Sequence, residues 1–263
     1  MGKLIGFLLK ELIGFLLFVL LAPLIYSFVS EAYLFLVSGI SFDSISWFVC
    51  GLLSYLFLYI LIAWIGDGLL YSIIFFEHLE HELGHSLVNF MFLGGTRKLI
   101  ANPRNKFIEL MGAPPSESEG EETSKAELFS LQGSNFLITL APYYFPVLTV
   151  PLLIAKPLAF FPLREIIDFL IGFTLAFHFI GLLLREFRFW QKDIADCGRI
   201  FSSCVICLLN TIVLVIALCV ASSNYSAILD YFQNSIARTP ESYQTELQIL
   251  MMLNDLKDQL LQQ

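Results

Sequence analysis

The chain has 263 residues, of which 57% are hydrophobic and 14% are charged, and its formal net charge is -8 at pH 7. A soluble globular domain carries about a quarter charged residues and about half apolar ones, so this composition excludes a soluble enzyme, a disordered protein and a small disulfide scaffold. The negative charge, without a basic stripe, also argues against a nucleic-acid partner. The sequence therefore predicts an integral membrane protein in contact with the lipid bilayer.

Six stretches are apolar and long enough to cross a bilayer as a helix, which needs about 20 residues. We expect an all-α, multi-pass fold whose spans lie near 4–29, 45–65, 69–93, 134–155, 166–184 and 200–221. The fourth stretch contains Pro142, Pro146 and Pro151, and each proline removes a backbone donor. We therefore expect the fourth span to be kinked or partly unwound.

Residues 1–222 are predicted to form the transmembrane domain, and 223–263 an extramembrane tail. A flexible acidic loop near 112–126 interrupts the spans and has the composition of a solvated linker. Within the tail, Leu247 and Leu250 fall near one helical stripe, which predicts an amphipathic helix over its final part. The acidic loop and this helix are the two candidates for binding a protein partner.

Basic residues near the ends of the spans predict the orientation of the chain. The loops that follow the third and fifth spans carry nine Lys and Arg residues, against four near the membrane on the other side. Because cytoplasmic loops are enriched in basic residues, we expect these two loops to be cytoplasmic. The compact size and short loops favour a bacterial inner (cytoplasmic) membrane.

His81, Glu82 and His85 form an HExxH motif within the third predicted span. On a helix, positions i and i+4 lie on one face, about 6 Å apart along the axis, so the two imidazoles can bind one zinc ion. Glu82 could take a proton from a zinc-bound water and pass it to a leaving amine. The chain has four histidines, and random placement would give about 0.003 such motifs. Ionisable residues inside a span are functional candidates by default.

A catalytic zinc ion needs a third protein ligand and an open position for water. Asp193, just before the sixth span, is our choice for the third ligand, and Asp196 is the alternative. His78 lies on the same helical face as His81 and could orient a ligand from outside the first coordination shell. His178, in the fifth span, could contact the substrate or be a structural histidine bonded to a neighbouring helix.

Three stretches of the chain carry a resemblance to a known family. They are His81-Glu82-Leu83-Gly84-His85-Ser86-Leu87, the pair Gly94-Gly95 after it, and the aspartate region Gln191-x-Asp193-Ile194. Together they resemble the site-2-protease family of intramembrane zinc metallopeptidases, as a compact bacterial-type relative. The resemblance implies that His81, His85 and Asp193 hold zinc and that Glu82 activates water. It also implies hydrolysis of a peptide bond in or next to a transmembrane segment of a membrane protein substrate.

Two other functions fit the sequence. The chain could be a non-proteolytic membrane subunit of a complex, in which a metal site is kept for structural reasons. It could also be a small transporter with a His/Glu relay, which fits the ionisable residues of the third span but does not require the HExxH order. The peptidase and the subunit differ in what they require of Glu82, because the peptidase depends on its carboxylate and the subunit does not.

Overall fold

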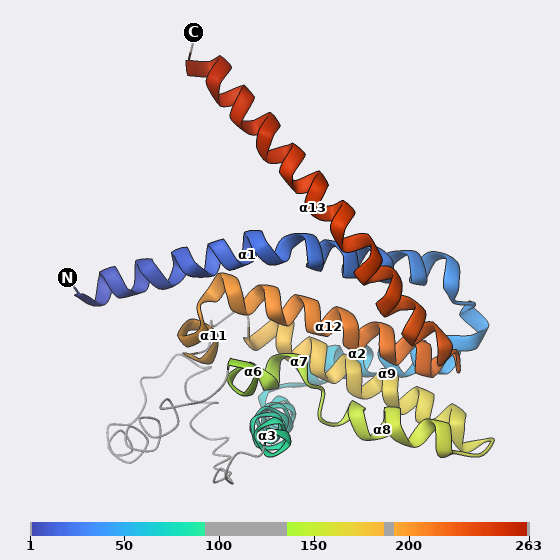
Figure 1. The fold of residues 1–263 in the computed structure, drawn as a ribbon. Coiled ribbons are helices and arrows are strands. Elements are labelled where there is room, and N and C mark those ends of the chain that lie inside the picture. Colours follow the sequence, from blue (N-terminus) through green and yellow to red (C-terminus); the bar gives the residue numbers. More distant parts are fainter. Residues whose placement is uncertain (1, 93–135, 187–191, 262–263) are drawn as a thin grey trace. The chain divides into compact units, whose positions relative to one another are not determined.

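The computed structural model describes residues 2–92, 136–186 and 192–261. Within these ranges every regular element is a helix and there is no strand (Figure 1), which confirms the predicted all-α class. The acidic loop near 112–126, Gly94-Gly95 and Gln191 lie outside the described residues. The described helices belong to two compact units, Met1–Ile45 with Gly198–Gln263 and, separately, Ser46–Cys197.

Four described helices are long and apolar enough to cross a membrane. They cover Glu11–Gly39, Phe42–Ile65, Leu163–Leu184 and Arg199–Ala221, and they correspond to the first, second, fifth and sixth predicted spans. The chain thus has the character of a membrane protein. The third predicted span forms a single helix, α3 (Asp67–Met91), but its glutamates make it too polar to count among the four. The prediction of six spans, with HExxH on the third, stays a prediction.

The first unit contains α1 (Gly2–Leu34), α12 (Arg199–Ala221) and α13 (Ser226–Leu261), and α1 packs against both of the others. Its core includes the ring of Phe28 in edge-on contact with Tyr231, with ring centroids 5.7 Å apart. The Tyr231 hydroxyl also donates a hydrogen bond to the Phe28 carbonyl at 3.1 Å. This contact fixes the first part of α13 on α1.

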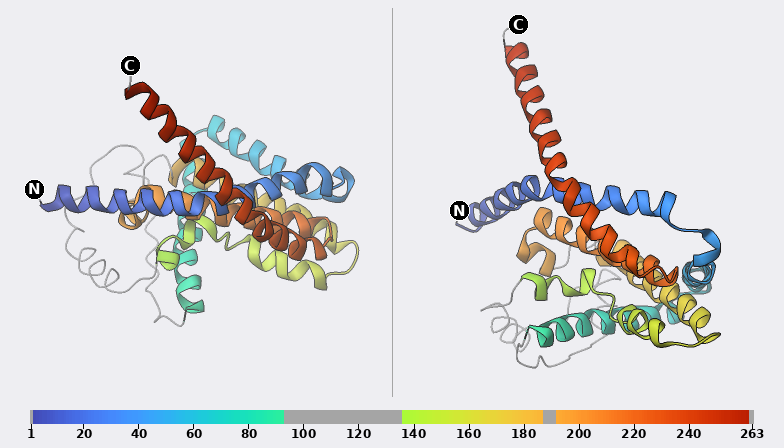
Figure 2. Two further views of the ribbon diagram at one scale, coloured as in Figure 1. Left: turned by 45° about the horizontal axis from the view of Figure 1, so that its top comes forward. Right: turned by 45° about the vertical axis from the view of Figure 1, so that its right-hand side comes forward.

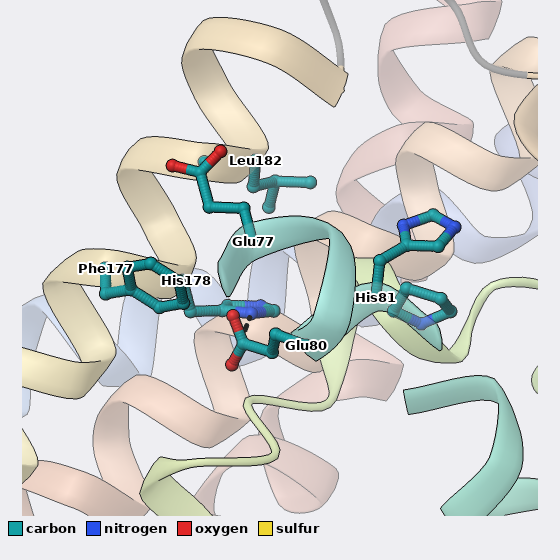
Figure 3. Close-up of a pocket in the computed structure, with 8 residues that line it drawn as sticks. Glu77, Glu80, His81, Phe177, His178 and Leu182 are labelled. Atoms are coloured by element: carbon teal, nitrogen blue, oxygen red, sulfur yellow. Dashed lines mark ion pairs between the residues drawn. The ribbon is translucent and has the colours of Figure 1, made fainter. Parts of the chain in front are cut away.

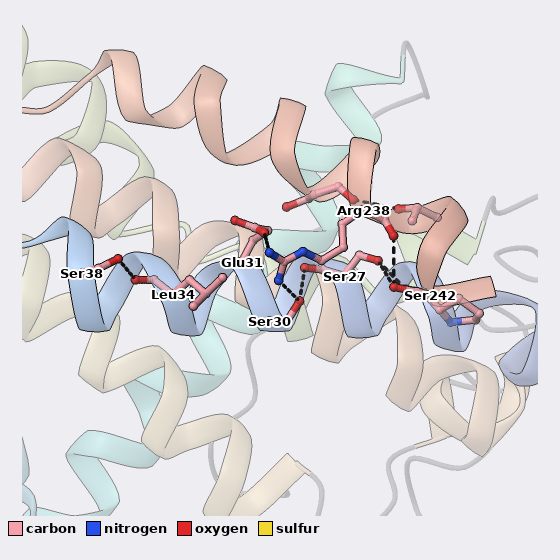
Figure 4. A network of polar contacts seen from close by, with 10 residues as sticks. Ser27, Ser30, Glu31, Leu34, Ser38, Arg238 and Ser242 are labelled. Atoms are coloured by element: carbon pink, nitrogen blue, oxygen red, sulfur yellow. Dashed lines mark hydrogen bonds and ion pairs between the residues drawn. The ribbon is translucent and has the colours of Figure 1, made fainter. Parts of the chain in front are cut away.

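Polar side chains join α1 and α13 further along (Figure 4). Arg238 lies 2.8 Å from the Glu31 carboxylate, and the hydroxyls of Ser27 and Ser242 are hydrogen-bonded at 2.8 Å. The beginning of the predicted amphipathic tail helix is therefore docked on its own chain. The division between membrane domain and tail at residue 222, and a protein partner for the rest of the tail, stay predictions.

The second unit is built around α2 (Ser46–Ile65) and α9 (Leu163–Gly181), which pack at very short range. A Cβ atom on Gly51 would lie 1.9 Å from the carbonyl oxygen of Phe169, and one on Gly172 would lie 2.0 Å from that of Phe48. The two backbones touch at these glycines. No other residue type fits there without moving a helix.

The fourth predicted span is broken, as its prolines predict. The chain forms α6 (Phe136–Thr139), α7 (Ala141–Tyr144) and α8 (Thr149–Ala155) as separate short helices, which Figure 2 shows as the yellow-green segment. Pro142 lies in α7, and Pro146 lies in the non-helical link that follows. Tyr143 is fully buried. This irregular backbone lies against protein, which is the setting in which broken helices are tolerated at membrane depth.

Candidate metal centre

The HExxH motif lies on α3, and its two histidines face the same way. The rings of His81 and His85 are 4.9 Å apart between centroids and nearly perpendicular. Both residues are buried, with 7% and 5% of their surface exposed. A regular helix explains the pairing, because one turn separates the two positions.

Asp193 reaches both histidines from α11 (Lys192–Cys197). Its Oδ2 atom lies 3.3 Å from Nε2 of His85 and 3.7 Å from Nε2 of His81. The three ligand atoms all lie within 4.8 Å of one another. Two tetrahedral ligands that each lie 2.0–2.1 Å from one zinc ion are about 3.3 Å apart, so this group could hold a metal ion. Asp196, the alternative third ligand, lies outside the group.

A backbone carbonyl fixes the orientation of His85. Its Nδ1 atom lies 2.9 Å from the carbonyl oxygen of Ile138, and because a carbonyl can only accept, Nδ1 carries the hydrogen. The lone pair is then on Nε2, the atom that faces Asp193. On the same helix Gly84 lies close to Pro142, since a Cβ atom there would lie 3.1 Å from Cα of Pro142.

Ring packing supports His81, and the neighbouring histidines affect the charge of Asp193. The ring of the fully buried Tyr143 meets His81 edge-on, with centroids 5.4 Å apart. Burial raises the pKa of Asp193, but the His81 and His85 rings, when they are protonated, lower it by hydrogen bonding and charge, so that the pKa lies below the usual aspartate range. The carboxylate is therefore ionised at neutral pH, which is the state that binds a metal ion.

The remaining predicted residues lie around this group. Glu82 is half-buried, and its backbone carbonyl accepts a hydrogen bond from Ser86. His78 stacks on His81 with ring centroids 6.4 Å apart. His178 is not in the group of three: it lies on α9 beside Glu80, with Nδ1 3.7 Å from the Glu80 carboxylate (Figure 3).

Two contributors to the metal centre, Ile138 and Tyr143, were not among the predicted site residues, and neither was Glu80, which lies beside His178. Ile138 acts through its backbone and Tyr143 through ring packing, so neither has a sequence signature. Glu80 did carry a signal, because it is an acidic residue inside a predicted span.

Comparisons of the chain with family models, with curated proteins and with solved structures found no match. The likeness to site-2 proteases therefore stays an expectation from the sequence motifs.

Proposed function

We propose that this chain is an intramembrane zinc metallopeptidase that cleaves membrane protein substrates in or next to their transmembrane segments. The observation that carries the proposal is the convergence of Nε2 of His81, Nε2 of His85 and one carboxylate oxygen of Asp193. Two imidazoles and a carboxylate are a known donor set of catalytic zinc sites, in which the fourth position stays open. The donors are neutral nitrogen and anionic oxygen, and this set suits zinc better than calcium or magnesium.

The roles of the residues follow from their positions. His81, His85 and Asp193 would hold the zinc ion, which when bound lowers the pKa of water and polarises a peptide carbonyl. Glu82, between the two histidines on α3, accepts the proton of the attacking water and passes it to the departing amine. The hydrogen bond from His85 to the Ile138 carbonyl keeps the imidazole in the tautomer that binds metal.

A substrate inside the membrane must expose a peptide carbonyl before it can react. Helical backbone is already hydrogen-bonded, so the substrate helix must unwind locally beside the centre. The four apolar helices support a membrane location for the enzyme. A bacterial inner membrane is the setting that we propose on the grounds of compact size and short loops.

The decisive experiment compares the wild type with Glu82→Gln, both co-expressed with the membrane proteins of the host. Mass spectrometry of new peptide amino termini should find cuts in or next to apolar segments with the wild type and none with Glu82→Gln. The variant should retain its zinc, because Glu82 is not a ligand. His81→Ala/His85→Ala is the matched control and should lose about one zinc per chain. Normal cleavage by Glu82→Gln would refute the mechanism. Absence of cleavage by both proteins would favour the subunit function.

A further inference from the structure

The turn that joins α8 to α9 has an unusual composition for a connecting segment (Figure 1). Between Lys156 and Arg164 the sequence is Pro-Leu-Ala-Phe-Phe-Pro-Leu, without a single polar side chain. One turn of 3-10 helix covers Lys156–Leu158, and α9 begins at Leu163. Turns in water are normally rich in Gly, Asn, Asp and Ser as well as Pro. Residues 157–163 are called the apolar turn below.

The large side chains of the apolar turn point away from the protein. Leu158 is 85% exposed, Phe160 is 72% exposed and Phe161 is 74% exposed. Within the turn only Ala159 is buried. Single exposed apolar side chains are common on any protein, but several large ones close together mark a surface that contacts a membrane or another protein.

The charge at the start of this segment is hidden instead. Lys156 is 1% exposed and forms an ion pair with Asp168 of α9. This is the reverse of a turn in water, where a lysine extends into the solvent and aromatic rings are covered. The arrangement fits surroundings of low polarity, in which exposed apolar side chains carry no penalty and a free charge is costly.

The backbone of the apolar turn also has partners within the protein. The Ala159 carbonyl accepts a hydrogen bond from Nε of Arg164 at 2.7 Å, and the Phe160 carbonyl accepts one from the Arg164 N–H at 3.3 Å. The two prolines of the turn have no N–H that needs a partner. Because lipid offers no hydrogen bonds to the backbone, these features lower the cost of moving the turn out of water.

The neighbouring surface of α9 identifies the partner of the turn as lipid. Leu163–Leu184 is one of the four described helices that are apolar and long enough to cross a membrane. Ile166, in the first part of this helix, is 55% exposed, so the apolar surface of the turn continues along α9. Arg164 is exposed where the turn meets the helix, and a guanidinium at this position can bind lipid phosphate.

We propose that the apolar turn is a membrane anchor, in which Leu158, Phe160 and Phe161 lie among the acyl chains just below the lipid headgroups. Phenylalanine and leucine are side chains that interfacial segments bury at this boundary. Arg164 lies at the level of the phosphates and holds the turn in shape through its bonds to the two carbonyls. The anchor fixes the depth at which α9 enters the bilayer. It goes beyond the proposed peptidase activity and does not depend on it.

The test measures the depth of position 160 in the full-length protein, reconstituted in phosphatidylcholine vesicles. The three tryptophans, Trp47, Trp64 and Trp190, are replaced by Phe, and Phe160→Trp then supplies the only indole. Phosphatidylcholine brominated near the top of its acyl chains should remove most of the indole emission, whereas iodide in the water should have little effect. Ile166→Trp in the same background is the matched control on α9 and should respond in the same way.

Quenching of the Phe160→Trp emission by iodide and not by brominated lipid would place the turn in water and overturn the anchor. Quenching by neither would show that protein covers the turn, for example a second copy of the chain, and would also overturn it. If the tryptophan-free background does not fold, the wild type in vesicles with a photoreactive acyl chain decides. Mass spectrometry should then find lipid attached within 157–163, and labelling of α9 without labelling of the turn would refute the anchor. None of these measurements depends on proteolysis.

Discussion

At the scale of single residues, Asp193 reaches the two imidazoles of α3 from a different helix. Asp193 lies on the short helix α11 together with Asp196. The two aspartates are three positions apart, which is less than one helical turn. Sequence spacing could not choose between them, because both precede the same predicted span. In the structure Oδ2 of Asp193 lies 3.7 Å from Nε2 of His81 and 3.3 Å from Nε2 of His85. The two aspartates therefore should differ in their effect on metal binding.

Asp193→Asn should weaken zinc binding by more than the roughly 10–100-fold that loss of a supporting partner costs, because it removes a charged ligand. Asp196→Asn is the control and should change the affinity little. Zinc affinity is measured by competition with a chromophoric chelator. The reverse order of the two variants would make Asp196 the third ligand.

The motif itself could be predicted, but the contacts that support it could not. His81 and His85 are one turn apart in any helix, so their pairing follows from sequence spacing alone. The carbonyl that accepts the hydrogen bond of His85 comes from Ile138, 53 positions later, and Pro142, close to Ile138 in the chain, packs closely on Gly84. The proximity of Glu80 and His178 likewise arises from the packing of α3 near α9. No local pattern encodes such contacts.

At the scale of elements, backbone contact replaces side-chain packing between α2 and α9. Small residues let helices approach closely, a common device in membrane proteins, where lipid offers no hydrophobic drive for helices to associate. Gly51 and Gly172 each face a carbonyl oxygen of the partner helix. A methyl group at either position has no flexible neighbour that can move away. This pair of helices should therefore tolerate no substitution at its crossing.

Gly51→Ala and Gly172→Ala should each lower the free energy of unfolding by about 1–3 kcal/mol, the usual cost of overpacking. Gly14→Ala in α1 is the matched control, because a Cβ atom there would lie 3.6 Å from its nearest neighbour, at ordinary contact distance. Unfolding in mixed micelles, followed by helix content, measures all three. Equal stability of Gly51→Ala and Gly14→Ala would contradict the close crossing.

Composition predicted the long helices better than it predicted their relation to the membrane. The four apolar helices stand out because each contains a long stretch of high hydropathy with few charged residues. In α3 the ionisable residues that mark a functional site also reduce the hydropathy of the helix. By composition, a membrane span with a functional site therefore cannot be distinguished from a buried helix of a soluble protein. The position of the break between α7 and α8 could be predicted, because Pro146 lies in the link between them and a proline interrupts a helix. The arrangement of the short helices around this break could not be predicted.

At the scale of the whole molecule, the candidate chemistry and the long tail helix belong to different units. His81, His85, Asp193, Glu80 and His178 all lie within Ser46–Cys197, whereas α13 belongs to the other unit. The polar contacts of α13 with α1 end near Ser242. Beyond them, Leu247 is 59% exposed and Met252 is 70% exposed. The described side chains of α13 between 244 and 252 thus contribute little to the core of their own unit.

Deletion of residues 244–263 should leave cleavage and zinc content at wild-type levels and change the free energy of unfolding by less than about 1 kcal/mol, because surface residues contribute little to stability. Deletion of 226–263 is the comparison: it also removes Tyr231 and Arg238, and it should destabilise the first unit. Cleavage is measured by the amino-terminal mass spectrometry used for Glu82→Gln, and unfolding by helix content. A peptidase whose site lies within Ser46–Cys197 has no chemical need for the last twenty residues. Loss of function on the shorter deletion, with zinc and stability intact, would instead show that the chain works by binding a partner through this helix.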